Sequence, residues 1–266
     1  MRLRARLMSS LVSALLATAS GLAPMAAADG LSLPLPGPPN AEPRIVGGSA
    51  TSTAQHPWVV ALVTAAGAPY CGGTLAAPDR VVTAAHCVAV TAPTELRVVA
   101  GRTDMRTNEG VVSLVRDVWV HPDYRSSTEG DDIAVLTLDR RPGYPTLPLA
   151  GDPAAAPPGS AVAVLGWGFT EEGGQASPTL QRAEVHVLAD PDCSAAYREY
   201  QPGGMLCAGE PQGGADACNG DSGGPLVADG RLVGVTSFGS GCGRPGLPGV
   251  YTRVSSYAPL LEEQLR

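Results

Sequence analysis

The feature that most constrains the fold is a succession of short apolar runs, rich in β-branched residues and separated by glycine and proline. The chain has 33 glycines and 25 prolines among its 266 residues, and both residue types interrupt helices and favour turns. Short apolar runs between turns are typical of strands, where β-branched side chains pack well. The runs that we expect to form strands are 58–63, 81–82, 96–99, 111–115, 133–138, 161–165, 183–188 and 232–236.

The end of the chain has a helical period instead. Apolar side chains from residue 254 onward fall on one helical face, and Ser255 or Ser256 could cap its start. These apolar residues are Val254, Tyr257, Leu260, Leu261 and Leu265. The segment 151–160, which is rich in proline and glycine, is the expected connection between two halves. The pattern therefore predicts an all-β protein with a C-terminal helix over about 254–266.

The first 28 residues have the pattern of a secretory signal peptide. Three arginines precede a short apolar run, 7–22, and the small residues 26–28 offer a cleavage site. A membrane anchor is the alternative, but the run is shorter than the ~20 residues that span a bilayer, and Pro24 ends it. No later stretch could cross a membrane. We therefore expect a secreted, extracellular protein whose mature form does not contact a membrane.

The cysteines and the charge narrow the classes of function. Six cysteines, an even number, agree with disulfides formed in an oxidising compartment, although the sequence alone leaves their pairing open. Because no Cys-x-x-Cys occurs, we do not expect structural zinc. The net charge of −7 leaves no basic stripe, so nucleic acid is not an expected partner.

A serine between glycines is the strongest candidate for chemistry. Ser222 stands in the segment 220–224, where a tight turn would expose its hydroxyl and the neighbouring amides. A serine hydroxyl needs a base to accept its proton, and His86 follows an apolar run beside a cysteine. The base in turn needs a carboxylate, which either Asp131 or Asp132 could supply. The residues alone do not choose between these two.

The order of the candidate residues along the chain excludes one known class of enzymes with a catalytic serine and argues against another. In the α/β-hydrolases the catalytic histidine follows the serine, whereas all four histidines of this chain precede Ser222. That alternative therefore fails. The order of subtilisin requires an aspartate before the histidine. Asp79 satisfies the order, but the residues around it do not match that family.

Several motifs, taken in order, resemble one known family. They are Thr83-Ala84-Ala85-His86-Cys87, Asp132-Ile133-Ala134-Val135-Leu136, Gly166-Trp167-Gly168 and Asp216-Ala217-Cys218-Asn219-Gly220-Asp221-Ser222-Gly223-Gly224-Pro225-Leu226. From residue 44 to about residue 266 the chain resembles the chymotrypsin-like serine proteases, and the trypsin-like members most of all. The resemblance implies an all-β fold of two packed six-stranded antiparallel barrels, about 45–145 and 146–253, followed by the C-terminal helix. It also implies a serine endopeptidase.

The resemblance assigns roles to the site residues. Ser222 would attack the peptide carbonyl, His86 would act as general base and then general acid, and Asp132 would orient His86. The backbone N–H groups of Gly220 and Ser222 would form the oxyanion hole. Ser237 occupies the position that supports the aspartate.

Specificity also follows from the resemblance. Asp216 would lie at the base of the S1 pocket and favour arginine or lysine through charge-assisted hydrogen bonds. Gly239 and Gly249 match the pocket walls, and Phe238 replaces a tryptophan that is common at its place. Because Ala217 has no hydroxyl to help hold an ammonium group, we expect arginine to be preferred over lysine.

The bond between Arg44 and Ile45 resembles the family's activation site. Residues 29–44 would then be a removable pro-segment, and 45–266 would be the protease domain. Cleavage would release the α-amino group of Ile45, which in relatives pairs with the residue matching Asp221 and acts as a conformational latch. Because Arg44 matches the expected specificity, self-activation is a reasonable hypothesis.

Disulfide pairs and ligands complete what the resemblance implies. The pairs are Cys71–Cys87, Cys193–Cys207 and Cys218–Cys242. The segment that matches a calcium loop, about 101–115, is shortened, and Arg102 stands where a liganding glutamate is usual. Since calcium requires several oxygen ligands, we expect no metal, and we expect no cofactor.

The expected partners are protein or peptide substrates with arginine or lysine at the cleaved position, together with protein protease inhibitors. We expect a monomer. The alternative is a catalytically silent homologue that acts as a binding protein. A protease with chymotrypsin-like apolar specificity is a further alternative, which Asp216 opposes.

Overall fold

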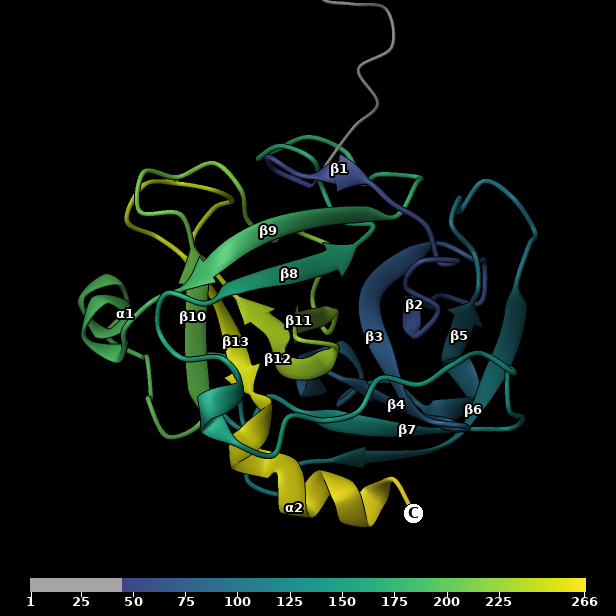
Figure 1. Cartoon of the computed structure of the whole chain (residues 1–266). Coiled ribbons are helices and arrows are strands. Elements are labelled where there is room, and N and C mark those ends of the chain that lie inside the picture. Colours follow the sequence, from purple (N-terminus) through teal and green to yellow (C-terminus); the bar gives the residue numbers. More distant parts are fainter. Residues whose placement is uncertain (1–44) are drawn as a thin grey trace, which may run out of the picture. The chain divides into compact units, whose positions relative to one another are not determined.

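The computed structural model describes residues 45–266, so Arg44 and the predicted signal peptide and pro-segment lie outside the described residues. Within this range the chain forms two closed antiparallel β-barrels of six strands each (Figure 1), which confirms the predicted fold. Both barrels close because each strand pairs with a neighbour on either side, which leaves no open edge within the ring. A long connection, residues 139–160, joins them and contains a short 3₁₀ turn at Pro153–Ala155.

The first barrel has the strand order β2-β3-β4-β7-β6-β5. Its strands are β2 (Val59–Val63), β3 (Pro69–Ala77), β4 (Arg80–Thr83), β5 (Arg97–Ala100), β6 (Val111–Val120) and β7 (Ala134–Leu138). All five residues of β2 are buried, as expected for an apolar run that is covered on both faces. Short 3₁₀ turns at Ala85–Cys87 and Pro93–Glu95 connect β4 to β5.

The second barrel has the ring order β8-β9-β10-β13-β12-β11 and closes through pairing of β11 with β8. Its strands are β8 (Ala161–Gly166), β9 (Gln181–Val187), β10 (Met205–Gly209), β11 (Pro225–Ala228), β12 (Arg231–Phe238) and β13 (Gly249–Arg253). Helix α1 (Asp190–Ala196) lies between β9 and β10. An apolar cluster shared by β2 and β8, which includes Ala61 and Leu165, lies between the two barrels.

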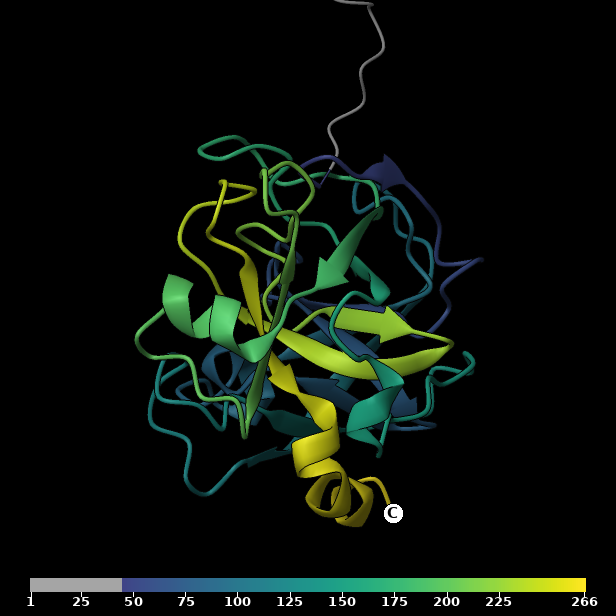
Figure 2. The same ribbon diagram turned by 60° about the vertical axis from the view of Figure 1, so that its left-hand side comes forward.

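Each end of the described residues, 45–266, packs against the opposite barrel. The two-residue strand β1 (Ser49–Ala50) precedes the first barrel but pairs with β9 of the second. Helix α2 (Val254–Gln264) follows the second barrel, yet its buried residues join the hydrophobic cluster of the first. The Arg80 side chain on β4 also donates a hydrogen bond to the carbonyl of Gln264. Figure 1 and Figure 2 both show α2 continuing directly from β13.

The detailed prediction for α2 was partly wrong. The helix begins after Arg253, and no side chain caps its first turn, so neither Ser255 nor Ser256 acts as the N-cap. Leu260 is 39% exposed, and the buried face contains Ala258 instead. The helix therefore presents a slightly rotated face to the core.

Four strands of the barrels, β3, β10, β11 and β13, were not predicted. Strand β3 contains the pair Gly72-Gly73, and glycine normally weakens a strand. A Cβ atom at Gly72 would lie only 2.9 Å from the Cα of Gly224 in the other barrel, and one at Gly73 would meet Val81. Close approach of distant segments therefore requires these glycines, and a local pattern does not reveal it.

Three disulfides are present, with the pairing that the resemblance implied: Cys71–Cys87, Cys193–Cys207 and Cys218–Cys242. The first lies in the first barrel and the other two in the second. None of the helices formed by residues 45–266 has the length and apolar character needed to span a bilayer.

Candidate active site

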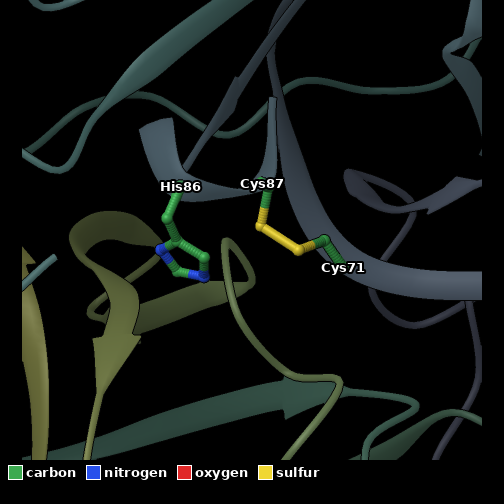
Figure 3. A group of neighbouring side chains, drawn as sticks. All are labelled: Cys71, His86 and Cys87. Carbon is green, nitrogen blue, oxygen red and sulfur yellow. A yellow bond between two sulfur atoms is a disulfide. The ribbon is translucent and has the colours of Figure 1, made fainter. Parts of the chain in front are cut away.

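His86 lies on the 3₁₀ turn that follows β4, next to the disulfide between Cys71 and Cys87. Its imidazole and the two sulfur atoms lie within 4.8 Å of one another, a spacing that a metal could bridge. The sulfur atoms are bonded to each other, however, so they provide no thiolate ligand. Figure 3 shows the imidazole beside this disulfide, with the two sulfur atoms bonded to each other. The disulfide therefore anchors the turn that carries His86 rather than forming a metal centre.

Asp132 is buried, and its carboxylate is surrounded by donors. Oδ2 lies 2.7 Å from Nδ1 of His86 and accepts a 2.6 Å hydrogen bond from the Ser237 hydroxyl, while Oδ1 accepts one of 2.9 Å from the backbone N–H of His86. Two contacts to one residue fix both the ring and the backbone of His86. The neighbouring Asp131 instead accepts a hydrogen bond from Tyr257, so Asp132 is the carboxylate that faces the histidine.

Ser222 lies on a turn that only glycine neighbours permit. Gly220 and Gly223 have positive φ angles of 94° and 76°, and a Cβ atom at Gly223 would overlap the hydroxyl of Thr83. The carbonyl of Ser222 accepts a 2.7 Å hydrogen bond from the N–H of Gly72 in the first barrel. The turn is thereby held against the barrel that carries His86.

A cavity of about 180 Å³ opens beside Ser222 and contains every predicted pocket residue. These are Asp216, Ala217, Ser237, Phe238, Gly239 and Gly249. Sequence reasoning missed three further lining residues, Asn219, Thr236 and Gly241, and the disulfide-bonded Cys218 and Cys242 complete the wall of the cavity. A Cβ atom at Gly239 would meet nothing closer than 3.8 Å, so the absence of a side chain there leaves the cavity open.

Asp216 is the buried charged group of this cavity, with 3% of its surface exposed. Its Oδ2 accepts a 3.0 Å hydrogen bond from the N–H of Gly243, whereas Oδ1 has no hydrogen-bond partner among residues 45–266. Burial raises the pKa of Asp216 to about 6, and the backbone N–H groups of Gly243, Ala217 and Gly249 oppose that rise. An unpaired carboxylate oxygen in a buried cavity is costly unless a cationic ligand supplies donors.

Asp221 is fully buried behind the serine turn. Its carboxylate accepts hydrogen bonds from the N–H groups of Gly168, at 2.8 Å, and Cys218, at 3.0 Å. Burial nevertheless raises the pKa of Asp221 to about 7. A Cβ atom at either Gly166 or Gly168 would overlap this carboxylate, which explains why the Gly-Trp-Gly motif accompanies it.

Ile45, the first described residue, is also fully buried and packs in the hydrophobic cluster of the second barrel. Nearby, the backbone carbonyl of Val46 accepts a hydrogen bond from the N–H of Asp216. The start of the described chain therefore contributes to both the core of this barrel and the wall of the cavity.

The loop that resembles a calcium site contains the positively charged side chain of Arg102. Arg102 is 9% exposed, and its Nε donates a 2.7 Å hydrogen bond to the carbonyl of Glu109 across the loop. Its guanidinium thus binds a backbone oxygen of the kind that a calcium ion would need.

Sequence reasoning missed one support of the site. The Thr252 hydroxyl on β13 donates a 2.7 Å hydrogen bond to the backbone carbonyl of Asp132. The two residues are 120 positions apart in the sequence, and no local signal connects them.

Comparison with known proteins agrees with this geometry. The family model described as Trypsin matches residues 45–261. The chain is 52% identical over 222 residues to a trypsin of Saccharopolyspora erythraea, covering 83% of this chain and 98% of the relative. It is 40% identical over 242 residues to the vitellin-degrading protease of Bombyx mori, covering 89% and 91%. It is 39% identical over 237 residues to trypsin eta of Drosophila melanogaster, covering 83% and 88%.

The match spans both barrels and includes the buried aspartates, the histidine turn and the serine turn. Such a match does not favour the alternative of a silent binding homologue. The chain therefore belongs to the trypsin family and is a trypsin-like serine endopeptidase of the chymotrypsin fold.

Proposed function

We propose that this endopeptidase cleaves peptide bonds after arginine, and less efficiently after lysine. The observation that carries the proposal is the unpartnered, buried Oδ1 of Asp216 in the cavity beside Ser222. A guanidinium group would supply two parallel donors to that carboxylate. An ammonium group has a smaller reach, and Ala217 offers no hydroxyl to compensate. An apolar side chain would leave Oδ1 buried without a partner.

The proposed chemistry uses Ser222, His86 and Asp132 as a catalytic triad. His86 accepts the proton of the Ser222 hydroxyl as the oxygen attacks the substrate carbonyl, and an acyl-enzyme forms when His86 returns the proton to the leaving amine. Asp132 holds the imidazole through Nδ1 and stabilises its charged form. Water then releases the acyl group by the same steps in reverse order.

The oxyanion hole is proposed at the N–H groups of Gly220 and Ser222. Around them the N–H groups of Asp221, Gly223 and Gly224 all donate to backbone carbonyls. In contrast, the N–H groups of Gly220 and Ser222 donate to no acceptor within residues 45–266. Two free donors beside the nucleophile suit the developing negative charge of a tetrahedral intermediate.

Activation is proposed to follow cleavage between Arg44 and Ile45. The new α-ammonium group of Ile45 would pair with Asp221, which has no cationic partner among residues 45–266. The side chain of Ile45 is already buried in the second barrel, so the ammonium would enter with little rearrangement. In this proposal residues 1–28 are a signal peptide, 29–44 a pro-segment and 45–266 the mature protease.

The mature enzyme is proposed to be a secreted, extracellular monomer. Its partners would be proteins or peptides with arginine or lysine at the cleaved position, and protein inhibitors that present such a residue. Arg44 itself fits this specificity, so the precursor is proposed to activate itself. If a Ser222→Ala precursor were processed at the normal rate in pure form, self-activation would be excluded.

Initial rates on matched peptide amides that end in arginine, lysine or phenylalanine test the specificity. The enzyme is the full chain cleaved after Arg44, and a Ser222→Ala variant is the control. Fast cleavage after arginine, slower cleavage after lysine and none by the control are expected. Equal rates on all three peptides would contradict the role of Asp216, and an inactive but correctly cleaved enzyme would contradict the triad.

A further inference from the structure

The residue before the buried carboxylate has an unusual backbone. Asp131 has a φ of 54°, and Asp229 is the other non-glycine residue with positive φ among residues 45–266. This left-handed conformation costs most residues about 1–2 kcal/mol, although aspartate and asparagine tolerate it better. The N–H of Ile133 donates a 2.8 Å hydrogen bond to the carbonyl of Asp131, which closes a tight turn around Asp132. The chain therefore reverses direction sharply at the catalytic aspartate.

The Asp131 side chain is held by the C-terminal helix. Its Oδ1 accepts a 2.9 Å hydrogen bond from the hydroxyl of Tyr257 on α2. Burial, and then this bond, raise the pKa of Tyr257 well above its usual value, so the phenol remains a donor. Since the aspartate accepts from a partly buried neutral group, the contact does not depend on a surface ion pair.

A buried histidine supports the same contact. The ring of His121 packs edge-on against Tyr257 with a centroid distance of 5.3 Å. Its Nδ1 lies 3.8 Å from Oδ1 of Asp131 and accepts a 3.3 Å hydrogen bond from the N–H of Asp123. The backbone N–H of His121 also donates to the carbonyl of Ile133, just beyond the turn. His121 thereby connects the tyrosine to the turn itself.

We propose that Asp131 is a positioning residue for Asp132. Its left-handed backbone turns the next carboxylate toward His86, while Tyr257 pulls the Asp131 side chain in a different direction and keeps the turn in place. This inference rests on the proposed role of Asp132 in the triad. It makes helix α2, which is remote in sequence from both residues, part of the scaffold of the active site.

Substitutions at Asp131 separate its backbone role from its side-chain role. Asp131→Ala disfavours the left-handed backbone and removes the acceptor, so kcat should fall at least tenfold. Asp131→Gly restores the backbone alone and should recover part of that loss. Asp131→Asn keeps both the backbone preference and an acceptor for Tyr257, and should stay within about twofold of the wild type. Tyr257→Phe, which removes only the hydroxyl, should lower kcat about threefold.

The readouts distinguish positioning from general destabilisation. KM for an arginine peptide and Kd for benzamidine should not change, because neither the S1 cavity nor Asp216 contacts Asp131. The matched control is Asp229→Ala in the β11–β12 turn, which removes an aspartate of the same backbone conformation. The Asp229→Ala substitution should lower the free energy of unfolding and leave kcat unchanged. Rates are expressed per functional site, so a poorly folded fraction does not imitate a low kcat.

Two results would overturn the inference. One is an Asp131→Ala enzyme with the kcat of the wild type, and the other is an Asp131→Gly or Asp131→Asn enzyme no better than Asp131→Ala. An Asp132→Asn variant shows whether a negative result concerns the positioning role of Asp131 or the proposed triad. If Asp132→Asn is inactive while Asp131→Ala is fully active, the positioning role alone is wrong. If Asp132→Asn keeps full activity, the proposed triad is wrong.

Discussion

The pH dependence of cation binding gives the sharpest test of the proposed S1 site. Burial raises the pKa of Asp216 from 3.8 to about 6, so the empty cavity holds a mostly neutral carboxyl at acid pH. A cationic ligand such as benzamidine requires the ionised form. With a pKa of about 6, roughly 3% of the carboxyl is ionised at pH 4.5, and Kd should be about 30-fold weaker there than at pH 8. Affinity should rise with pH and level off above about pH 7.

Calorimetry on the cleaved Ser222→Ala protein measures this directly. In buffers of different ionisation enthalpy, binding at pH 5 should release close to one proton per ligand, and binding at pH 8 almost none. Asp216→Asn should weaken binding and remove the pH dependence. As a control for the neighbouring imidazole, the titration is repeated in a His86→Ala variant. A Kd that stays constant from pH 4.5 to pH 8 in that variant would refute the reasoning.

Three further predictions follow from the geometry. Gly168→Ala places a methyl group against the Asp221 carboxylate. The displaced carboxylate should disorder the proposed oxyanion hole next to it, so kcat/KM should fall at least ~100-fold. Near-normal activity would contradict this. Ser237→Ala removes a donor to a buried carboxylate. That bond is worth about 1.5–3 kcal/mol, so kcat/KM should fall about 10- to 100-fold, and an unchanged kcat/KM would contradict the role of this bond. Arg102→Met removes the hydrogen bond to the Glu109 carbonyl and should lower Tm by about 2–8 °C. A chelator should leave the Tm of the wild type unchanged. A Tm that falls when the chelator is added would reveal a metal in that loop.

Most strands of the first barrel and half of those of the second could be predicted because their apolar residues are local and β-branched. Strands β3 and β13 were missed for a shared physical reason. Gly72 and Gly249 are needed because another segment approaches too closely for a side chain: the backbone of Gly224 in one case, and the Asp216 carboxylate in the other. These requirements arise only after the chain has folded, so no pattern of neighbouring residues reveals them.

The parts of the site that could be predicted from the sequence are those that depend on adjacent residues. The glycines around Ser222 indicate a tight turn even in isolation. The residues alone could not choose between Asp131 and Asp132, because that choice depends on a backbone conformation. A φ of 54° at Asp131 directs the two carboxylates to different partners, His86 for one and Tyr257 for the other. The family resemblance made the choice, and the structure provides its physical reason.

Because β1 and α2 each pack on the opposite barrel, the connecting segment is dispensable as a covalent link. If the backbone were cut within residues 139–160, the N-terminal fragment would still hold β1 in the second barrel, and the C-terminal fragment would still lay α2 on the first. No disulfide would need to bridge the cut, since Cys71–Cys87 lies wholly in one fragment and the other two pairs lie wholly in the other. A nicked enzyme would thus persist as a two-chain complex with the cavity beside Ser222 intact, and activity would be lost when the two fragments dissociate rather than when the backbone is cut.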